Sequence, residues 1–219
     1  MTNKYIYFIA NWKMFGGLKT LNSLNKVISF SKNYGKYKFK IIYCPPTTLI
    51  HNLSQKFKQS SIEVGAQNCN ENLEYTSLTG QINSKMLRDV GAKYIILGHS
   101  ENRLNGESNK LINKKIKSSL KSGLRVIVCI GETLSEKRKN KTKRVLSNQI
   151  KSCLKGIKNL SNIVIAYEPV WAIGTGLIPK MDNLTKNIFF IKNSIKNKST
   201  KVLYGGSVNI KNIKDLKKI

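Results

Sequence analysis

Acidic residues are scarce in this chain, where 11 Asp and Glu stand against 39 Lys and Arg and leave a net charge of +28. Taken alone, that excess suggests a polyanionic partner such as nucleic acid. Arginine is scarce as well, although it is the residue that binds phosphates and bases bidentately; it occurs five times, at positions 88, 103, 125, 138 and 144. Because the lysines are scattered among Asn and Ile, we interpret them as a solvated surface and expect no nucleic-acid partner.

The chain also has few cysteines and no long hydrophobic run. Its four cysteines, at positions 44, 69, 129 and 153, are too far apart for a Cys-x-x-Cys pair. The first three lie in or beside apolar segments, where a free thiol behaves as a small hydrophobe, so a reducing, cytoplasmic location is expected. The apolar segment Tyr5–Ala10 is shorter than a signal-peptide core, and no stretch approaches the roughly 18 apolar residues that span a bilayer. We expect a soluble protein with no membrane partner.

Seven short apolar runs organise the chain, which is 219 residues long and 40% hydrophobic and is expected to form one domain over residues 1–219. The runs are predicted to be strands: Tyr5–Ala10, Phe39–Cys44, Ile62–Ala66, Tyr94–Leu97, Arg125–Ile130, Ile163–Tyr167 and Lys201–Tyr204. Their spacing of roughly 23 to 38 residues leaves room for a crossover helix in nearly every interval. Continuous apolar strands are typical of a sheet that is buried on both faces. Apolar residues at helical spacing predict helices in Lys110–Lys121, Thr142–Leu154 and Leu184–Ile195.

Alternating strands and helices leave two architectures, an open doubly wound sheet or a closed (β/α)8 barrel. Polar residues stand where several different strands end: Asn11 after the first, His99 after the fourth and Glu168 after the sixth. Active sites of barrel enzymes are built at that rim, whereas an open sheet concentrates them at one switch point. Only a predicted helix, Asn209–Ile219, follows the seventh strand, so an eighth strand and helix are missing. We therefore predict an α/β fold, a (β/α)8 TIM barrel that is incomplete and has seven recognisable strands.

The segment Ala166–Gly176 resembles a base placed under a lid. Glu168 ends a buried strand, and Pro169 fixes the backbone after it. An apolar Trp-Ala-Ile tip follows, and then a Gly-Thr-Gly stretch that is free to change conformation. The alternative is a surface loop with an exposed Glu, but a Trp-Ala-Ile tip suits a solvated loop poorly.

Two further groups add to this pattern. His99 ends an apolar strand, and His is the usual proton-transfer side chain near neutral pH, although a strand-end His is more often structural. Asn11 and Lys13 place an amide and an ammonium after the first strand. In a lysine-rich chain, a lone Lys is more often plain surface charge.

Taken together, these segments resemble the triosephosphate isomerase family over essentially the whole chain. The resemblance rests on a series of motifs in order: Asn11-Trp12-Lys13-Met14, Gly65-Ala66-Gln67-Asn68, Thr79-Gly80, Gly98-His99-Ser100-Glu101, Cys129-Ile130-Gly131-Glu132-Thr133, Ala166–Gly176, and Tyr204-Gly205-Gly206-Ser207-Val208. Any one of them could arise by chance, but the set in this order is hard to explain otherwise.

The resemblance implies an isomerase of glycolysis and gluconeogenesis whose substrates are dihydroxyacetone phosphate and glyceraldehyde 3-phosphate. Glu168 would be the base that moves a proton between C1 and C2, and His99 the electrophile that polarises the substrate oxygens. Lys13, helped by Asn11, would stabilise the negative charge of the enediolate and the phosphate.

Other positions follow from the same resemblance. Glu101 would organise Lys13 and the base, while Gly174 and Ser207 would offer backbone N–H groups to the substrate phosphate. No cofactor and no metal are required, because the proton is acidic enough once the carbonyl is polarised.

The chain departs from the family pattern in two places. The glycine-rich turn that ends the eighth strand and completes the phosphate site has no counterpart in these residues, so substrate binding should be weaker while isomerase activity is kept. The lost strand would also expose two sheet edges, a known hazard for association. Asn102 stands where the family usually has Arg, beside the expected catalytic His.

The segment Cys69–Gln81 resembles the protruding loop by which family members form dimers, its tip reaching Asn11 and Lys13 of the neighbour. A homodimer is therefore expected. The alternative is an ordinary long surface loop.

Two rival functions remain. One is a degenerate barrel without catalysis, kept as a binding or structural protein, which the missing phosphate turn favours and the retained catalytic side chains and lid oppose. The other is a basic nucleic-acid-binding module, which a salt-dependent binding assay would reveal.

Overall fold

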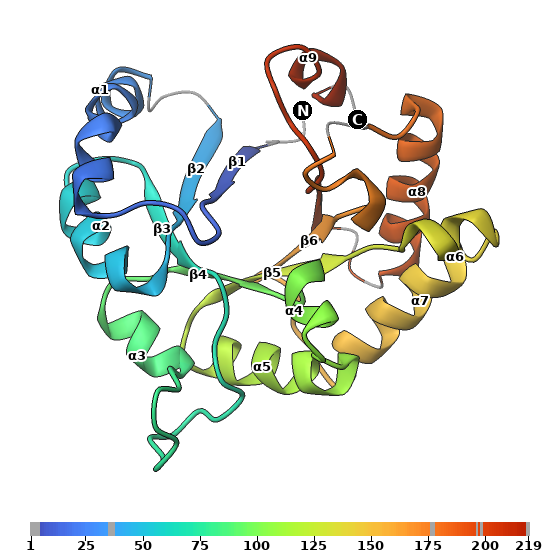
Figure 1. Ribbon diagram of the computed structural model, residues 1–219, viewed down its shortest axis with the longest axis horizontal. Helices are drawn as coiled ribbons and strands as arrows, with labels where there is room; N and C mark the ends of the chain where they lie inside the picture. Colours follow the sequence, from blue (N-terminus) through green and yellow to red (C-terminus); the bar gives the residue numbers. More distant parts are fainter. Residues whose placement is uncertain (1–4, 35–37, 176–177, 196, 198, 218–219) are drawn as a thin grey trace. The chain divides into compact units, whose positions relative to one another are not determined.

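The computed structural model describes residues 5–34, 38–175, 178–195, 197 and 199–217 (Figure 1). The chain falls into two compact units. The first comprises Met1–Leu97 with Lys117–Val126, and the second comprises Gly98–Ile116 with Ile127–Ile219. The single domain expected from the sequence stays a prediction.

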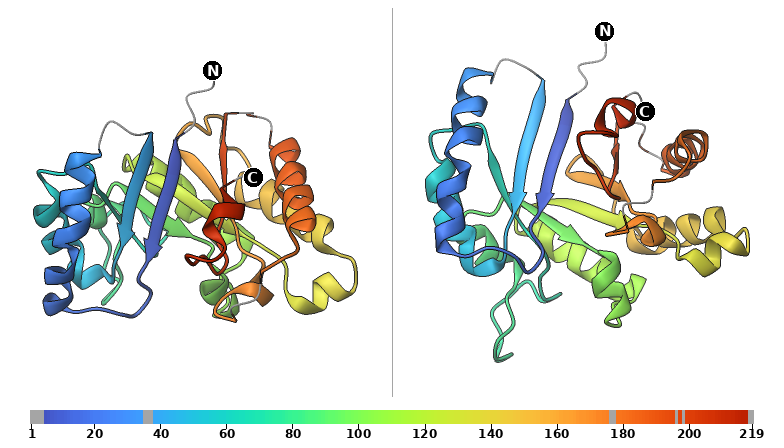
Figure 2. Two further views of the ribbon diagram at one scale, coloured as in Figure 1. Left: turned by 90° about the horizontal axis from the view of Figure 1, so that it is seen from above. Right: turned by 45° about the horizontal axis from the view of Figure 1, so that its top comes forward.

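The first unit contains four strands that pair in parallel in the order β1-β2-β3-β4. Its elements are β1 (Ile6–Asn11), η1 (Leu18–Leu24), α1 (Asn25–Asn33), β2 (Phe39–Cys44), η2 (Thr47–Leu49), α2 (Ile50–Phe57), β3 (Glu63–Ala66), α3 (Ser84–Asp89) and β4 (Tyr94–Leu97). The β1–β2 ladder runs from Ile6 opposite Phe39 to Asn11 opposite Cys44, so these two strands end at the same level. Figure 2 shows them as neighbouring arrows that point the same way.

The second unit contains α4 (Ser100–Leu104) and then, after two elements shared between the units, a series of helices and strands. The shared elements are α5 (Asn109–Lys121) and β5 (Arg125–Ile130). The rest are α6 (Leu134–Arg138), α7 (Thr142–Cys153), β6 (Ile163–Tyr167), η3 (Val170–Ala172), α8 (Met181–Ser194), β7 (Lys201–Tyr204) and α9 (Ile213–Leu216). Strands β6 and β7 pair in parallel, with Tyr167 opposite Tyr204 at their ends.

The seven predicted strands are confirmed among the described residues, with shifts of one residue at β1 and β3. Every residue of β4 and of β6 is buried, as the unbroken apolar runs predict. By contrast, β1 and β7 are only half-buried. Among the described strands, β1 pairs with β2 and β7 pairs with β6, and each has a hydrogen-bonded strand on one flank only.

Helices cover the strands with the apolar faces that their spacing predicts. Helix α7 buries Leu146, Ile150 and Cys153, and α8 buries apolar side chains in the same way, beginning three residues earlier than expected. The terminal helix is shorter than the predicted Asn209–Ile219, because α9 spans only Ile213–Leu216, and residues 218–219 lie outside the described chain.

A charged and aromatic cluster ties together the first residues of several strands in the first unit. Glu63 opens β3 and pairs with Lys40 of β2 at 3.2 Å, and with Arg125 of β5 at 3.9 Å. The same Arg125 donates a hydrogen bond to the hydroxyl of Tyr94, the first residue of β4, at 2.9 Å. Burial raises the pKa of Tyr94 to about 12, so this hydroxyl stays protonated at neutral pH.

All four cysteines are buried and none forms a disulfide among the described residues, and burial raises the pKa of Cys44 to about 12. The burial of Cys44, Cys69 and Cys129 agrees with the apolar surroundings that the sequence suggests for them. Within the described residues, no helix is both long enough and apolar enough to cross a membrane.

Replacing Leu53 by Ala should destabilise the protein by about 2–5 kcal/mol, since a fully buried side chain of α2 leaves a cavity behind. The measurement is the free energy of unfolding in urea. Gln55→Ala on the exposed side of the same helix is the control and should change that free energy by no more than about 0.5 kcal/mol. Equal effects of the two substitutions would contradict this packing.

Candidate functional site

His99 is held at the junction between β4 and α4. Gly98 directly before it has a φ of 72°, a left-handed conformation that favours glycine. His99 is the N-cap of α4, and its Nδ1 accepts a hydrogen bond from the backbone N–H of Glu101 at 3.3 Å. Because Nδ1 uses its lone pair as an acceptor, the hydrogen of a neutral imidazole lies on Nε2. The side chain of His99 is 8% exposed.

Glu168 directly follows β6 and lies beside His99. Its backbone N–H donates to the carbonyl of Ile130 on β5 at 2.7 Å, which continues the strand ladder to this residue. Its Oε2 is 3.9 Å from Nε2 of His99, and the residue is 7% exposed. The carboxylate of Glu101 is 3.5 Å from the other ring nitrogen, Nδ1. The structure thus brings together three residues that the sequence singles out from two distant segments, while their catalytic roles stay predictions.

Two glycines leave the space that Glu168 occupies. A Cβ on Gly131 would lie 1.7 Å from the carbonyl oxygen of Glu168, and a Cβ on Gly205 would lie 2.6 Å from its Cγ. Both values are far below any real contact, so a side chain at either position would displace the base. Gln149 of α7 fixes Gly131 further, because its amide accepts from the glycine N–H at 2.8 Å and donates to the glycine carbonyl at 3.1 Å.

A buried carboxylate, Glu132, anchors the segment that follows Glu168. It accepts hydrogen bonds from the Tyr167 hydroxyl at 3.1 Å and from Nε1 of Trp171 at 3.0 Å. Asn187 of α8 donates to the same Tyr167 hydroxyl at 2.8 Å, and Nζ of Lys137 lies 3.2 Å from the centre of the Trp171 ring. Burial raises the pKa of Tyr167, with the Glu132 charge acting in the same direction. The sequence indicated no role for Glu132, although it lies within a recognised motif.

Gly174 and Ser207, which the resemblance assigns to the phosphate, lie in the loops after β6 and β7. Gly174 has a φ of 69°, a left-handed conformation that favours glycine, while Gly176 of the expected lid lies outside the described residues. The hydroxyl of Ser207 donates to the carbonyl of Ala172 at 2.9 Å. The loop after β7 therefore contacts the lid segment after β6, within the second unit.

Asn11 and Lys13 belong to the first unit and share one turn after β1. The backbone N–H of Lys13 donates to Oδ1 of Asn11 at 2.9 Å, and Lys13 adopts a φ of 52°, which is uncommon for a residue with a side chain. The side-chain amide of Gln67 supports the turn by donating to the carbonyls of Lys13 at 2.8 Å and of Cys44 at 2.9 Å. That Asn11 and Lys13 act on the same substrate as His99 and Glu168 stays a prediction.

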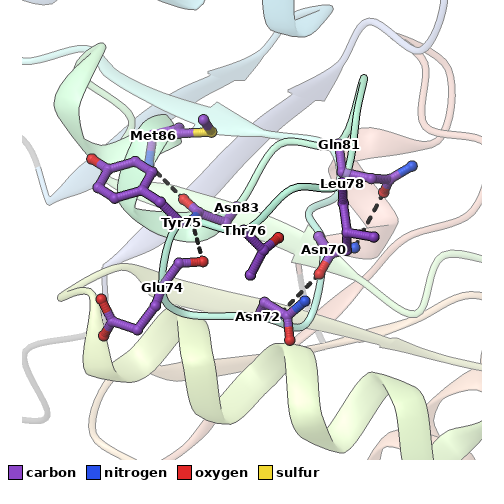
Figure 3. Close-up of a pocket in the computed structure, with 9 residues that line it drawn as sticks. All are labelled: Asn70, Asn72, Glu74, Tyr75, Thr76, Leu78, Gln81, Asn83 and Met86. Carbon is purple, nitrogen blue, oxygen red and sulfur yellow. Dashed lines mark hydrogen bonds between the residues drawn. The ribbon is translucent and has the colours of Figure 1, made fainter.

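The segment expected to form a dimer loop is held together by its own side chains (Figure 3). Asn70 and Gln81 pair across its base through their amides at 3.3 Å, and Asn83 donates to the carbonyls of Leu73 and Glu74. The cavity that this loop encloses has a volume of about 20 Å³. That is room for a single water molecule and not for a substrate.

Comparison with known proteins gives the chain its family. The model of the family described as triosephosphate isomerase matches residues 6–219. Triosephosphate isomerase of Aquifex aeolicus is 39% identical over 218 residues, covering 95% of this chain and 87% of that protein. The Leptospira interrogans enzyme is 40% identical, covering 95% of this chain and 88% of its own length.

A crystal structure of triosephosphate isomerase from Bartonella henselae superimposes with a TM-score of 0.86 at 30% identity, and the match covers 96% of this chain and 86% of that one. The fold is therefore a TIM barrel, as the sequence predicted. The chain belongs to the triosephosphate isomerase family.

Proposed function

We propose that Glu168 and His99 carry out the proton transfers of this isomerase, which interconverts dihydroxyacetone phosphate and glyceraldehyde 3-phosphate. The observation that carries the proposal is the 3.9 Å separation between a nearly buried carboxylate and the Nε2 of a nearly buried imidazole. A base and an electrophile at that separation can both reach adjacent carbons of one three-carbon substrate.

Each group has one task. Glu168 removes a proton from C1 of the ketose, and the electrons move onto the C2 carbonyl oxygen to form the enediolate. The hydroxyl proton then passes from the C1 oxygen to the C2 oxygen beside His99, and the carboxyl group of Glu168 returns its proton to C2, which leaves the aldehyde at C1. His99 donates a hydrogen bond from Nε2 to the substrate oxygens, since Nδ1 is engaged with the Glu101 N–H. Glu101 lies against Nδ1 and is a positioning residue for the ring.

Lys13 supplies positive charge for the enediolate and the phosphate, with Asn11 as its partner. The hydrogen bond from the Lys13 backbone to the Asn11 side chain supports this, because it fixes the turn from which both side chains start. Pre-oriented charges of this kind stabilise a developing oxyanion without reorganisation. Gly174 and Ser207 offer backbone N–H groups to the phosphate.

We also propose a homodimer in the cytoplasm. Met14 and Phe15 are 95% and 75% exposed, and Tyr75 and Leu78 of the loop in Figure 3 are exposed as well. Exposed apolar residues of this size within one unit are typical of a surface that associates, and a second copy of the chain is the partner. Four free, buried thiols support a reducing location.

A barrel without catalysis is the less favoured alternative. A chain kept only as a scaffold has no need of a carboxylate for which two glycines leave room, nor of a tryptophan anchored to a buried Glu132.

Glu168→Gln should lower kcat by about 10²–10⁴-fold, because an amide cannot accept the substrate proton. The measurement is the rate of glyceraldehyde 3-phosphate conversion by protein purified from a host that lacks its own isomerase. Asp182→Asn, which neutralises an exposed carboxylate of α8, is the matched control and should keep the wild-type rate. A folded wild-type chain that is no faster than Glu168→Gln would overturn the proposal.

Lys13→Met should reduce kcat/KM by about 10²–10³-fold, since it removes the charge that stabilises the enediolate while keeping the length of the side chain. Lys19→Met changes the overall charge equally at an exposed position of η1 and should leave the kinetics unaltered. If both variants lose the same activity, the effect belongs to the net charge and not to Lys13.

Static light scattering of the purified chain at micromolar concentration should give the mass of two chains. Phe15→Asp should shift it to the mass of one chain, because a charge in a buried apolar contact is strongly unfavourable. A fully active wild-type monomer would show that the exposed apolar residues do not serve dimerisation.

A further inference from the structure

The guanidinium of Arg103 in α4 donates hydrogen bonds to three oxygen atoms, one of which belongs to the peptide bond that precedes His99. Its Nε donates to the carbonyl of Gly98 at 2.7 Å, and its Nη2 donates to the carbonyl of Cys129 at 3.1 Å. Its Nη1 donates to Oδ1 of Asn109, the first residue of α5, at 2.6 Å. All of these residues belong to the second unit, and the sequence pattern assigned no role to Arg103.

The Gly98 carbonyl is the partner with the most direct consequence for His99. It belongs to the peptide bond that joins Gly98 to His99, so fixing it fixes the plane from which the imidazole side chain departs. A Cβ on Gly98 would lie 2.9 Å from Nη2 of Arg103, which shows how closely the guanidinium packs against the turn.

The Cys129 carbonyl connects the same guanidinium to Glu168. Cys129 precedes Ile130 on β5, and the Ile130 carbonyl accepts the backbone hydrogen bond of Glu168 at 2.7 Å. The Arg103 side chain thus contacts two backbone segments. One is the peptide bond before His99, and the other is strand β5, to which the backbone of Glu168 is hydrogen-bonded. The separation of His99 and Glu168 depends on both.

Only arginine can make this set of bonds. Its planar guanidinium presents five N–H donors in a fixed fork, so two carbonyls and an amide oxygen in different directions can be bonded at once. Lysine has one nitrogen on a flexible stem and cannot span them. The thiol of Cys153 is a further neighbour, 3.7 Å from Nη2, and its own burial raises its pKa and keeps it uncharged.

We propose that Arg103 is a positioning residue of this isomerase, which sets the orientation of the His99 imidazole relative to Glu168 by holding the Gly98 and Cys129 carbonyls. The inference rests on the proposed roles of His99 and Glu168. Arg103 itself has no contact with substrate in this scheme, so its replacement should affect the chemical step more than substrate binding.

The first test is the kinetics of Arg103→Lys, which keeps the positive charge and removes the planar set of N–H donors. We expect kcat to fall by about 10–100-fold with KM changed by less than about threefold, because small misplacements of a catalytic group cost that much. The matched control is Arg88→Lys in the first unit, which also loses a hydrogen bond to a glycine carbonyl, that of Gly123, and should keep the wild-type kcat. An unchanged kcat in folded Arg103→Lys would overturn the proposal.

The second test observes the imidazole directly. The chain has two histidines, and His51 is exposed on α2, so a His51→Gln background leaves His99 as the single imidazole in a ¹⁵N NMR spectrum. We expect one neutral tautomer with the proton on Nε2 in this background, and a mixture of tautomers or a shifted titration after Arg103→Lys. A purely structural role would lower the unfolding temperature and leave this spectrum unchanged, which would contradict the proposal.

If Arg103→Lys fails to fold, Asn109→Ala provides the same readouts with a milder change. It removes only the oxygen that orients Nη1, so kcat should fall by about 3–10-fold and the His99 spectrum should move in the same direction. Wild-type kinetics and spectrum in that variant would overturn the proposal. An inactive wild-type chain, in contrast, would refute the proposed function while the NMR comparison would still test the role of Arg103.

Discussion

The backbones around Glu168 approach one another so closely that positions 131 and 205 have no room for a side chain. The carbonyl of Glu168 faces Gly131 of the segment after β5, and its Cγ faces Gly205 after β7. Within this packing the carboxylate of Glu168 is buried and lies 3.9 Å from the imidazole of His99. Gln149 closes the arrangement from α7 by bonding both polar groups of Gly131.

Much of the fold could be predicted from the sequence because its strands are short, apolar and separated by strong helical patterns. Strands β4 and β6 illustrate this, since each is apolar throughout and is buried throughout. The partial exposure of β1 could not be predicted in that way. Exposure of an apolar strand depends on whether another element covers it, and the strand's own residues do not indicate whether such an element is present.

In the candidate site, too, some residues could be predicted from the sequence and others could not. Glu168 and His99 could be singled out because proton-transfer side chains at the ends of buried strands are unusual. Glu132 and Arg103 could not, because their roles depend on partners far away in sequence: Glu132 binds Trp171, and Arg103 binds the carbonyl of Cys129. A carboxylate in a loop, such as Glu132, or a guanidinium on a short helix, such as Arg103, looks like ordinary surface charge until its partners are known.

Glu63, Lys40 and Arg125 lie within the first two residues of their strands, whereas Asn11 is the last residue of β1, and Lys13 and Gln67 follow the ends of β1 and β3. Within the first unit, the ion-pair cluster and the residues proposed to act on the substrate therefore lie at opposite ends of these parallel strands. The Glu63 end can be redesigned for stability, for instance by converting the ion pairs to tightly packed apolar contacts, without replacing any residue of the proposed site.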